Sequence, residues 1–338
     1  MGVVRSVVML LACAVATWAA EDGDAGLMFL KNEHIELGVL PQAAGRVVIL
    51  RRPGGHNILS SGPAQWQGIP DATGHSDFVD IGGHMLWVAP QSHWWRQQQH
   101  SFRTPASTWP PDPWLIIGRY RVLERGDDTL MLEGPSSPVS GLRLVKSYRL
   151  DGHRVVVTCT ATNTRDTAVS WGLWSNLQIR PSADAFVMTT DATHFELRFA
   201  ANAKGRSAPM PYSWIGDMLV IPQVRPDPDK DVSGKMFLRQ AVSALMAIDA
   251  DFCLVVRPEV QVSPRDVAPD HAPLEIFRNV PGAGSGTLEL EHHGEYRSLK
   301  PGEQMSLSES WEVHEFQGGP DLAERAAHAA ALATPKAR

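Results

Sequence analysis

The sequence has little cysteine and no long block of positive charge. Its 338 residues contain three cysteines, one of them near the N-terminus, so Cys159 and Cys253 are the two that remain for the body of the chain. In an oxidising compartment these two can pair or stay free, and disulfides are not the main source of stability. The formal net charge is −6. Without a concentrated Lys/Arg surface, we expect no nucleic-acid partner.

Long apolar runs are also missing. A short apolar run, Val7 to Ala16, follows one arginine and precedes small residues and then acids. This pattern predicts a signal peptide over residues 1–20. No segment approaches the roughly 20 apolar residues that a membrane-spanning helix needs. We therefore expect a periplasmic or extracellular protein without a membrane span; a lipoprotein anchored through Cys13 is the less favoured alternative.

Several catalytic motifs are absent as well. The chain has 13 histidines but neither an HExxH motif nor paired CxxC motifs, so we expect no metal and no cofactor. It also lacks a G-x-S-x-G motif. Together with the lack of alternating strands and helices, this argues against a Ser-His-Asp hydrolase.

Strand patterns dominate what is present. "LRLVKSYRLDGHRVVVTCTATNT" alternates apolar residues on both sides of Asp151-Gly152, and "RYRVLERGDDTLMLEGP" predicts another hairpin about Gly126-Asp127. Glycine and proline, 28 and 25 residues, interrupt the chain throughout. Many antiparallel strands without intervening helices predict an all-β fold, a large antiparallel β-sandwich formed by residues 21–319. "PDLAERAAHAAALA" predicts a short helix in a C-terminal tail, residues 320–338.

Tryptophans are concentrated in "GGHMLWVAPQSHWW", which ends at Trp95, and in "WPPDPW", which begins at Trp109. An indole offers a broad apolar face and one N–H donor, which suit the C–H face and hydroxyl rim of a pyranose. The alternative is that this excursion packs its own aromatics as a satellite core. The cluster as a whole favours a carbohydrate-binding wall. Its candidate ligand-binding residues are Asp80, Trp87, Gln91, Trp95, Trp109 and Asp112.

Several segments in order resemble a known family. They are "NEHIELGVLPQAAGRVVILRRPGGHNIL", "GGHMLWVAP", "TATNT" and "LKPGEQMSLSESWEVH", between Asn32 and His314. Their order resembles aldose 1-epimerases and, more closely, secreted bacterial proteins of unknown function with the galactose mutarotase-like fold. The resemblance implies a supersandwich whose concave sheet face holds a sugar.

The resemblance also suggests site residues. Galactose mutarotases carry a glutamate base on a late strand, and Glu275 in "LEIFRN" matches it best, with Glu289 and Glu291 as rivals. Their two histidines are missing, since Ile81 precedes the Gly-Gly pair and "WGLWSNLQIR" contains no histidine. Of the chain's histidines, His84 is the candidate for the acid if it points into the concave face.

Three further residues are candidates for sugar contacts. The family's second histidine falls in the region of Trp174 and Asn176, so the resemblance places these two in the pocket. Arg46 follows a glycine in a turn, where its planar fork could hold a hydroxyl or carboxylate or form a structural ion pair.

These observations leave three functional hypotheses. The first is a secreted carbohydrate-binding protein that acts on a sugar or glycan through acid/base chemistry, or only binds it. The second is an aldose 1-epimerase with relocated catalytic residues. The third is a non-enzymatic envelope protein whose tryptophans form a partner interface. The sequence leaves the sugar and the oligomeric state open.

Overall fold

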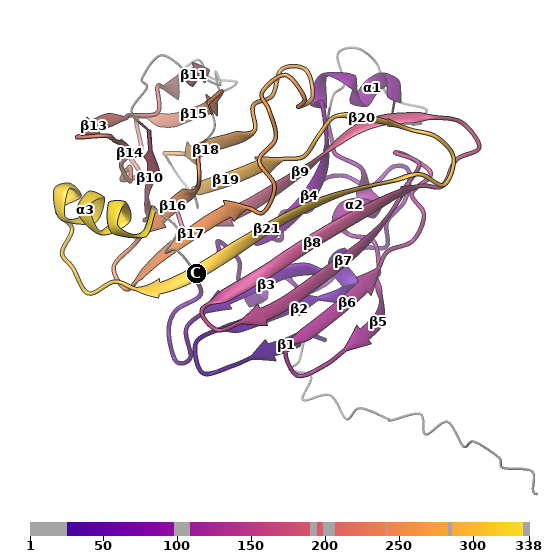
Figure 1. Ribbon diagram of the computed structural model, residues 1–338, viewed down its shortest axis with the longest axis horizontal. Helices are drawn as coiled ribbons and strands as arrows, with labels where there is room; N and C mark the ends of the chain where they lie inside the picture. The colour runs from indigo at the N-terminus through magenta and orange to yellow at the C-terminus, as the bar shows by residue number, and fades with distance from the viewer. Residues whose placement is uncertain are drawn as a thin grey trace, which may run out of the picture.

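Two large sheets, mainly antiparallel, pack on one another as a sandwich (Figure 1). They belong to a computed structural model that describes residues 26–97, 109–189, 195–198, 207–240, 242–282 and 286–333. The expected all-β sandwich fold is confirmed. The predicted signal peptide, including Cys13, lies outside the described residues.

Sheet A carries the candidate site and has 11 strands. In spatial order its main path is β1 (Met28–Lys31), β2 (Glu36–Leu40), β3 (Arg46–Arg51), β4 (His84–Ala89), β9 (Val169–Ile179), β19 (Thr287–His293), β18 (Leu274–Val280), β15 (Asp231–Leu238) and β11 (Phe195–Arg198). Two short strands flank this path: β12 (Ser207–Ala208) beside β15 and β20 (Arg297–Leu299) beside β9.

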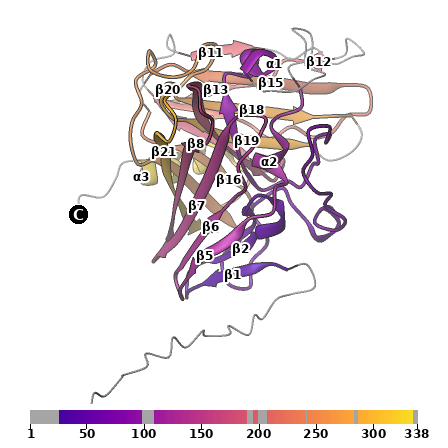
Figure 2. The same ribbon diagram turned by 90° about the vertical axis from the view of Figure 1, so that its right-hand side faces the viewer.

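Sheet B has 10 strands and covers one face of sheet A (Figure 2). Its order is β13 (Ser213–Ile215), β14 (Met218–Ile221), β10 (Asp184–Met188), β16 (Leu245–Ile248), β17 (Phe252–Pro258), β21 (Gln304–Glu315), β8 (Arg154–Asn163), β7 (Leu142–Asp151), β6 (Thr129–Glu133) and β5 (Arg121–Arg125). Both predicted hairpins are present, as β5–β6 and β7–β8. In β8 every second residue is buried and the threonines between them are partly exposed, which is typical of a sheet with one solvated face.

In the described segments, helices are few and short apart from the last one. They are η1 (Pro41–Ala43), η2 (Pro63–Gln65), η3 (Gln91–His93), α1 (Trp94–Gln97), α2 (Pro113–Ile116) and α3 (Leu322–Ala333). Helix α3 is the helix predicted after Pro320, and it packs against β10, β14, β16 and β17 with its alanine face buried (Figure 1). No helix in the described ranges is long and apolar enough to span a membrane.

The two remaining cysteines are free and buried in sheet B, Cys159 on β8 and Cys253 on β17. Burial raises the pKa of each thiol to about 12. Both are therefore neutral core side chains at ordinary pH.

Gly82 and Gly83 lead the chain into β4 through a conformation that only glycine can adopt here. Both have positive φ, +71° and +76°. A Cβ on Gly83 would lie 2.1 Å from the carbonyl oxygen of Val47, and one on Gly82 would lie 1.7 Å from that of Ser60. The pair thus lets β4 approach β3 closely.

Replacing Gly83 with alanine is expected to lower the free energy of unfolding by about 3 kcal/mol or more, because backbone clash adds to the cost of positive φ. Gly54→Ala is the matched control, since Gly54 has φ +73° and no atom within 4 Å of the added Cβ. It should cost only about 1–2 kcal/mol. Urea unfolding measures both, and equal losses would contradict the close approach at Gly83.

Candidate functional site

Polar side chains are buried at alternate positions on the central strands of sheet A. On β19, Glu289 and Glu291 are buried, and Glu291 lies opposite both Asn176 of β9 and Glu275 of β18. Residues two apart on a strand share a face. Ser175, which precedes Asn176 on β9, points to the opposite face, since its hydroxyl donates to Glu309 of sheet B. Asn176 and the three glutamates of β18 and β19 therefore lie on the outer face of sheet A. Buried charged groups are costly unless they are paired, which makes this face the candidate site.

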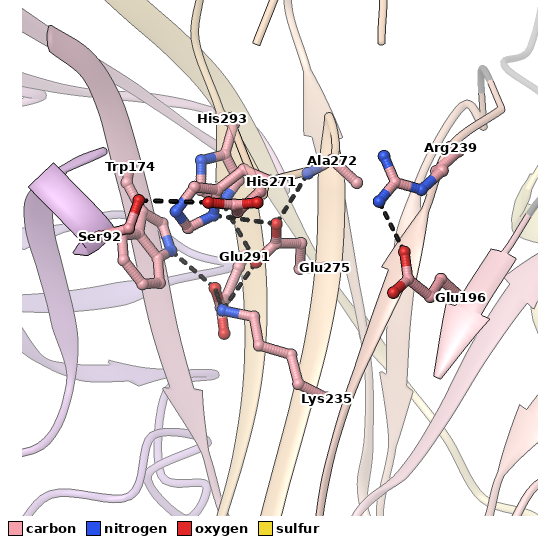
Figure 3. A network of polar contacts seen from close by, with 11 residues as sticks. Ser92, Trp174, Glu196, Lys235, Arg239, His271, Ala272, Glu275, Glu291 and His293 are labelled. Atoms are coloured by element: carbon pink, nitrogen blue, oxygen red, sulfur yellow. Dashed lines mark hydrogen bonds and ion pairs between the residues drawn. The ribbon is translucent and has the colours of Figure 1, made fainter. Parts of the chain in front are cut away.

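An ammonium group joins the two central carboxyl groups of this face. Lys235 of β15 places its Nζ 2.7 Å from Glu275 Oε2 and 2.7 Å from Glu291 Oε2. The indole Nε1 of Trp174 donates to the same oxygen of Glu291 at 2.6 Å. Figure 3 shows the lysine reaching both glutamates beside the tryptophan. Both glutamates are fully buried, whereas 20% of the Lys235 side chain is exposed, so the cluster reaches solvent at the lysine.

The two glutamates have pKa values shifted in opposite directions. Burial raises the pKa of Glu275, but His293, Lys235 and a hydrogen bond with His271 outweigh it and hold the pKa well below its usual range. Burial, with the negative charges of Glu275 and Glu289, raises the pKa of Glu291 to about 8 despite the opposing charge of Lys235. For Lys235 itself, burial lowers the pKa, and the two glutamates more than compensate and raise it.

Aromatic rings line the cluster on one side. The centroid of Trp174 lies 4.9 Å from that of Trp87 of β4, and Trp87 lies 5.8 Å from both Trp94 and Trp109. The ammonium of Lys235 is 4.4 Å from the centre of the Trp174 ring. Trp109 is 46% exposed, whereas Trp87 and Trp174 are buried. The tryptophan cluster is therefore partly core and partly an accessible wall.

Two histidines lie against Glu275 on the same face. His271 Nδ1 is 3.1 Å from Glu275 Oε1, and His293 Nε2 is 3.4 Å from Glu275 Oε2. The backbone N–H of Ala272 donates to Glu275 Oε1 at 2.8 Å and orients the carboxylate. Burial lowers the pKa of His293 to about 3 against the opposing charge of Glu275.

A second set of polar contacts surrounds Glu289, two residues before Glu291 on β19. Its carboxylate accepts hydrogen bonds from Asn176 Nδ2 at 2.7 Å and Gln178 Nε2 at 2.9 Å. Burial raises its pKa, and the nearby exposed Asp80 adds to the effect. Of the residues expected at the site, Asn176 therefore contacts Glu289, and Asp80 acts on it only through its charge.

His84 lies on the opposite side of sheet A, between the sheets. Its Nε2 is 2.9 Å from Ser175 Oγ, and its ring is 4.9 Å from that of Trp311 of β21. Ser175 donates to Glu309, which also pairs with His292 at 3.2 Å. Burial lowers the pKa of His84 to about 3. The structure does not bring His84 together with Glu275 and Glu291, because its position on β4 gives it the inward parity.

Two other expected site residues hold backbone segments. Arg46 is buried and donates to the carbonyl groups of Gly82 and Ile116. Asp112 caps α2 through the backbone N–H of Trp114 and accepts from Ser137. Both therefore make structural contacts.

The last two expected site residues, Gln91 and Trp95, lie in the short helices η3 and α1. Gln91 is partly buried in η3. Trp95 lies in α1, and its side chain is outside the described part.

A cavity of about 240 Å³ lies elsewhere, between the loop at Val260–Val262, β19 and β21. His292 and Leu307 are among its lining residues, and the tryptophans and glutamates of the candidate site are not. It does not contain the Glu275–Lys235–Glu291 cluster.

Three functional candidates escaped the sequence analysis: Lys235, His271 and His293. Lys235 is a single cation among buried residues in "DVSGKMFL". His271 precedes Glu275 by four residues, and His293 has the same strand parity as Glu291. These spacings carry meaning only once β15, β18 and β19 are known to be neighbours.

Comparisons with known proteins agree with this fold. A family model described as "Domain of unknown function (DUF4380)" matches residues 27–314. Searching the curated proteins gives no significant match.

Among solved structures, a galactose mutarotase-like protein from Lactobacillus casei is 10% identical with a TM-score of 0.53, over 86% of this chain and 100% of that chain. One from Clostridium acetobutylicum is 11% identical with a TM-score of 0.52, over 86% and 95%. The suspected relation to the galactose mutarotase-like fold is confirmed.

Proposed function

We propose that this chain, which belongs to the family described as domain of unknown function DUF4380, binds a sugar on the outer face of sheet A and transfers protons to and from it. The observation that carries the proposal is the pair of carboxyl groups, Glu275 and Glu291, joined by Lys235 beside the Trp174 ring. Ligand sites combine aromatic walls with a few converging polar groups.

Two carboxyl groups whose pKa values are shifted in opposite directions supply the acid and the base that opening and closing an aldose ring need. One carboxylate takes the proton of the anomeric hydroxyl while the other group protonates the ring oxygen, and the bond between C1 and that oxygen breaks. Reclosure on the other face of C1 returns both protons and gives the other anomer. The resemblance assigns the base to Glu275, which leaves Glu291 as the proton donor, and Lys235 balances the charge of the ionised Glu275.

Trp109→Ala is expected to weaken sugar binding about 3- to 10-fold, the cost of losing one aromatic contact. Trp109 suits this test because 46% of it is exposed, so its removal should disturb the core little. The measurement is quenching of intrinsic fluorescence, titrated with mono- and oligosaccharides that include uronic acids. Trp214→Ala is the control, because Trp214 lies on β13 of sheet B.

Each outcome of the titration bears on the proposal. A saturable response to one sugar, weakened by Trp109→Ala and unchanged by Trp214→Ala, would support it and name the sugar for an anomer-exchange measurement by NMR. Folded protein that responds to no sugar would refute it and favour the envelope interaction protein. With the predicted signal peptide, the proposal places the sugar in the periplasm or outside the cell.

A further inference from the structure

We infer that His271, Glu275 and His293 form a binding site for a divalent transition-metal cation of the zinc class. The three residues are buried and come from the loop before β18, from β18 itself and from the end of β19. Each offers one ligand atom, and these atoms all lie within 4.8 Å of one another. The inference needs no bound sugar, but it shares Glu275 with the proposed function, and this carboxylate cannot hold the cation and act as a free base at the same time.

The spacing of the ligand atoms approaches that around a tetrahedral ion. Zinc bonds to histidine nitrogen and carboxylate oxygen are about 2.0–2.1 Å long, which puts neighbouring ligand atoms of a tetrahedron about 3.3–3.4 Å apart. His271 Nδ1 is 3.1 Å from Glu275 Oε1, and His293 Nε2 is 3.4 Å from Glu275 Oε2. Each separation is close to the tetrahedral edge but ends on a different carboxylate oxygen, so one oxygen of Glu275 would meet both histidines only after the side chains draw together from their 4.8 Å spread.

His293 gives an independent reason to expect an ion. It is 1% exposed, its Nδ1 makes no hydrogen bond within the described part of the chain, and its Nε2 meets only Glu275 Oε2, at 3.4 Å. Buried ring nitrogens nearly always have a partner, and an exception calls for a bound ion or water.

The surroundings hold the three ligands in position. The Trp174 ring packs against His271 and His293, with centroids 4.8 and 5.2 Å away. Ala272 N–H fixes the Glu275 carboxylate at 2.8 Å. A hydrogen bond such as that from Ala272 sets the orientation of a metal ligand. Two histidines and one glutamate are a known ligand set for zinc that leaves a fourth position for water or a substrate atom.

Lys235 is the group that opposes the cation. Its ammonium lies 2.7 Å from Glu275 Oε2, so it would repel a dication bound to the same carboxylate. Removing this positive charge should strengthen metal binding, whereas removing a ligand should weaken it. The two substitutions therefore give opposite results only if the cation lies beside Glu275.

The test is a titration of chelator-treated protein with Zn²⁺ by calorimetry, together with the metal content of the untreated protein. We expect one ion per chain, binding about 100-fold or more weaker in His293→Ala, and binding about tenfold or more tighter in Lys235→Met. The control is His314→Ala, a partly exposed histidine of β21 paired with Glu312, which should match the wild type. Near-UV circular dichroism checks the fold of each variant.

Substitution of Co²⁺ keeps the inference testable if His293→Ala does not fold. Wild-type protein should give the visible absorption bands of four-coordinate cobalt bound by nitrogen and oxygen. Absence of these bands, absence of Zn²⁺ binding by folded wild type, equal losses in His293→Ala and His314→Ala, or weaker binding in Lys235→Met would each overturn the site. Metal binding without a sugar response would refute only the sugar proposal, and the reverse result would refute only the metal site.

Discussion

Replacing Glu291 with glutamine is expected to slow anomer exchange of a bound sugar about 100- to 10,000-fold, the usual contribution of a positioned proton-transfer group. Glutamine has the same shape as glutamate. In the wild type, Trp174 and Lys235 both donate to Glu291 Oε2, and the amide oxygen of glutamine can accept the same two hydrogen bonds. It cannot deliver or take the proton. Sugar binding by fluorescence should therefore persist while exchange measured by NMR is lost.

Glu291 is a cleaner test than Glu275, because Glu275 also contacts both histidines of the inferred metal site. The matched control is Glu315→Gln at the end of β21, where the side chain is 46% exposed and pairs with Arg52. This control should leave exchange unchanged. An exchange rate in Glu291→Gln equal to that of wild type would remove Glu291 from the chemistry.

Removing Arg325 is expected to destabilise the fold by about 3–5 kcal/mol, because it leaves a buried charge without its partner. Arg325 of α3 places Nη1 2.5 Å from Asp184 Oδ2 of β10, and both side chains are at most 5% exposed. Arg325→Ala also removes the donor to the carbonyl group of Gly319. The measurement is the free energy of unfolding from urea titration.

Two further variants separate the ion pair from general effects. Arg265→Ala removes an arginine whose side chain is 86% exposed, so unfolding should change by no more than about 0.5 kcal/mol. Arg325→Met combined with Asp184→Leu should cost less than Arg325→Ala, because no unpaired charge remains. An Arg325→Ala protein as stable as wild type would mean that α3 docks without using this pair.

The sequence by itself determined the fold class, because strand periodicity and turn chemistry are local properties. Alternation on both sides of Asp151-Gly152 was enough to predict β7 and β8, which pair through Asp151 and Arg154. A run of helix-forming residues after Pro320 was enough to predict α3. Its docking on sheet B through Arg325 depends on a residue 141 positions away and is not visible locally.

The site was only partly predictable, for the same physical reason. The resemblance pointed to Glu275, Glu291 and Trp174, and the structure brings these three together on one face. Strand parity then decided against His84, since the face to which a residue points depends on the register of its strand. In sheet A that register turns His84 toward Ser175 and the interior.

Tertiary structure alone decided which charges meet. Lys235, His271 and His293 come from separate strands and a loop, and none belongs to a motif of recognisable spacing. Their meaning depends on β15, β18 and β19 lying side by side, which long-range pairing establishes. Sequence patterns specify which residues alternate along a strand, whereas the order of strands in the sheet determines which carboxylates, imidazoles and ammonium groups share a site.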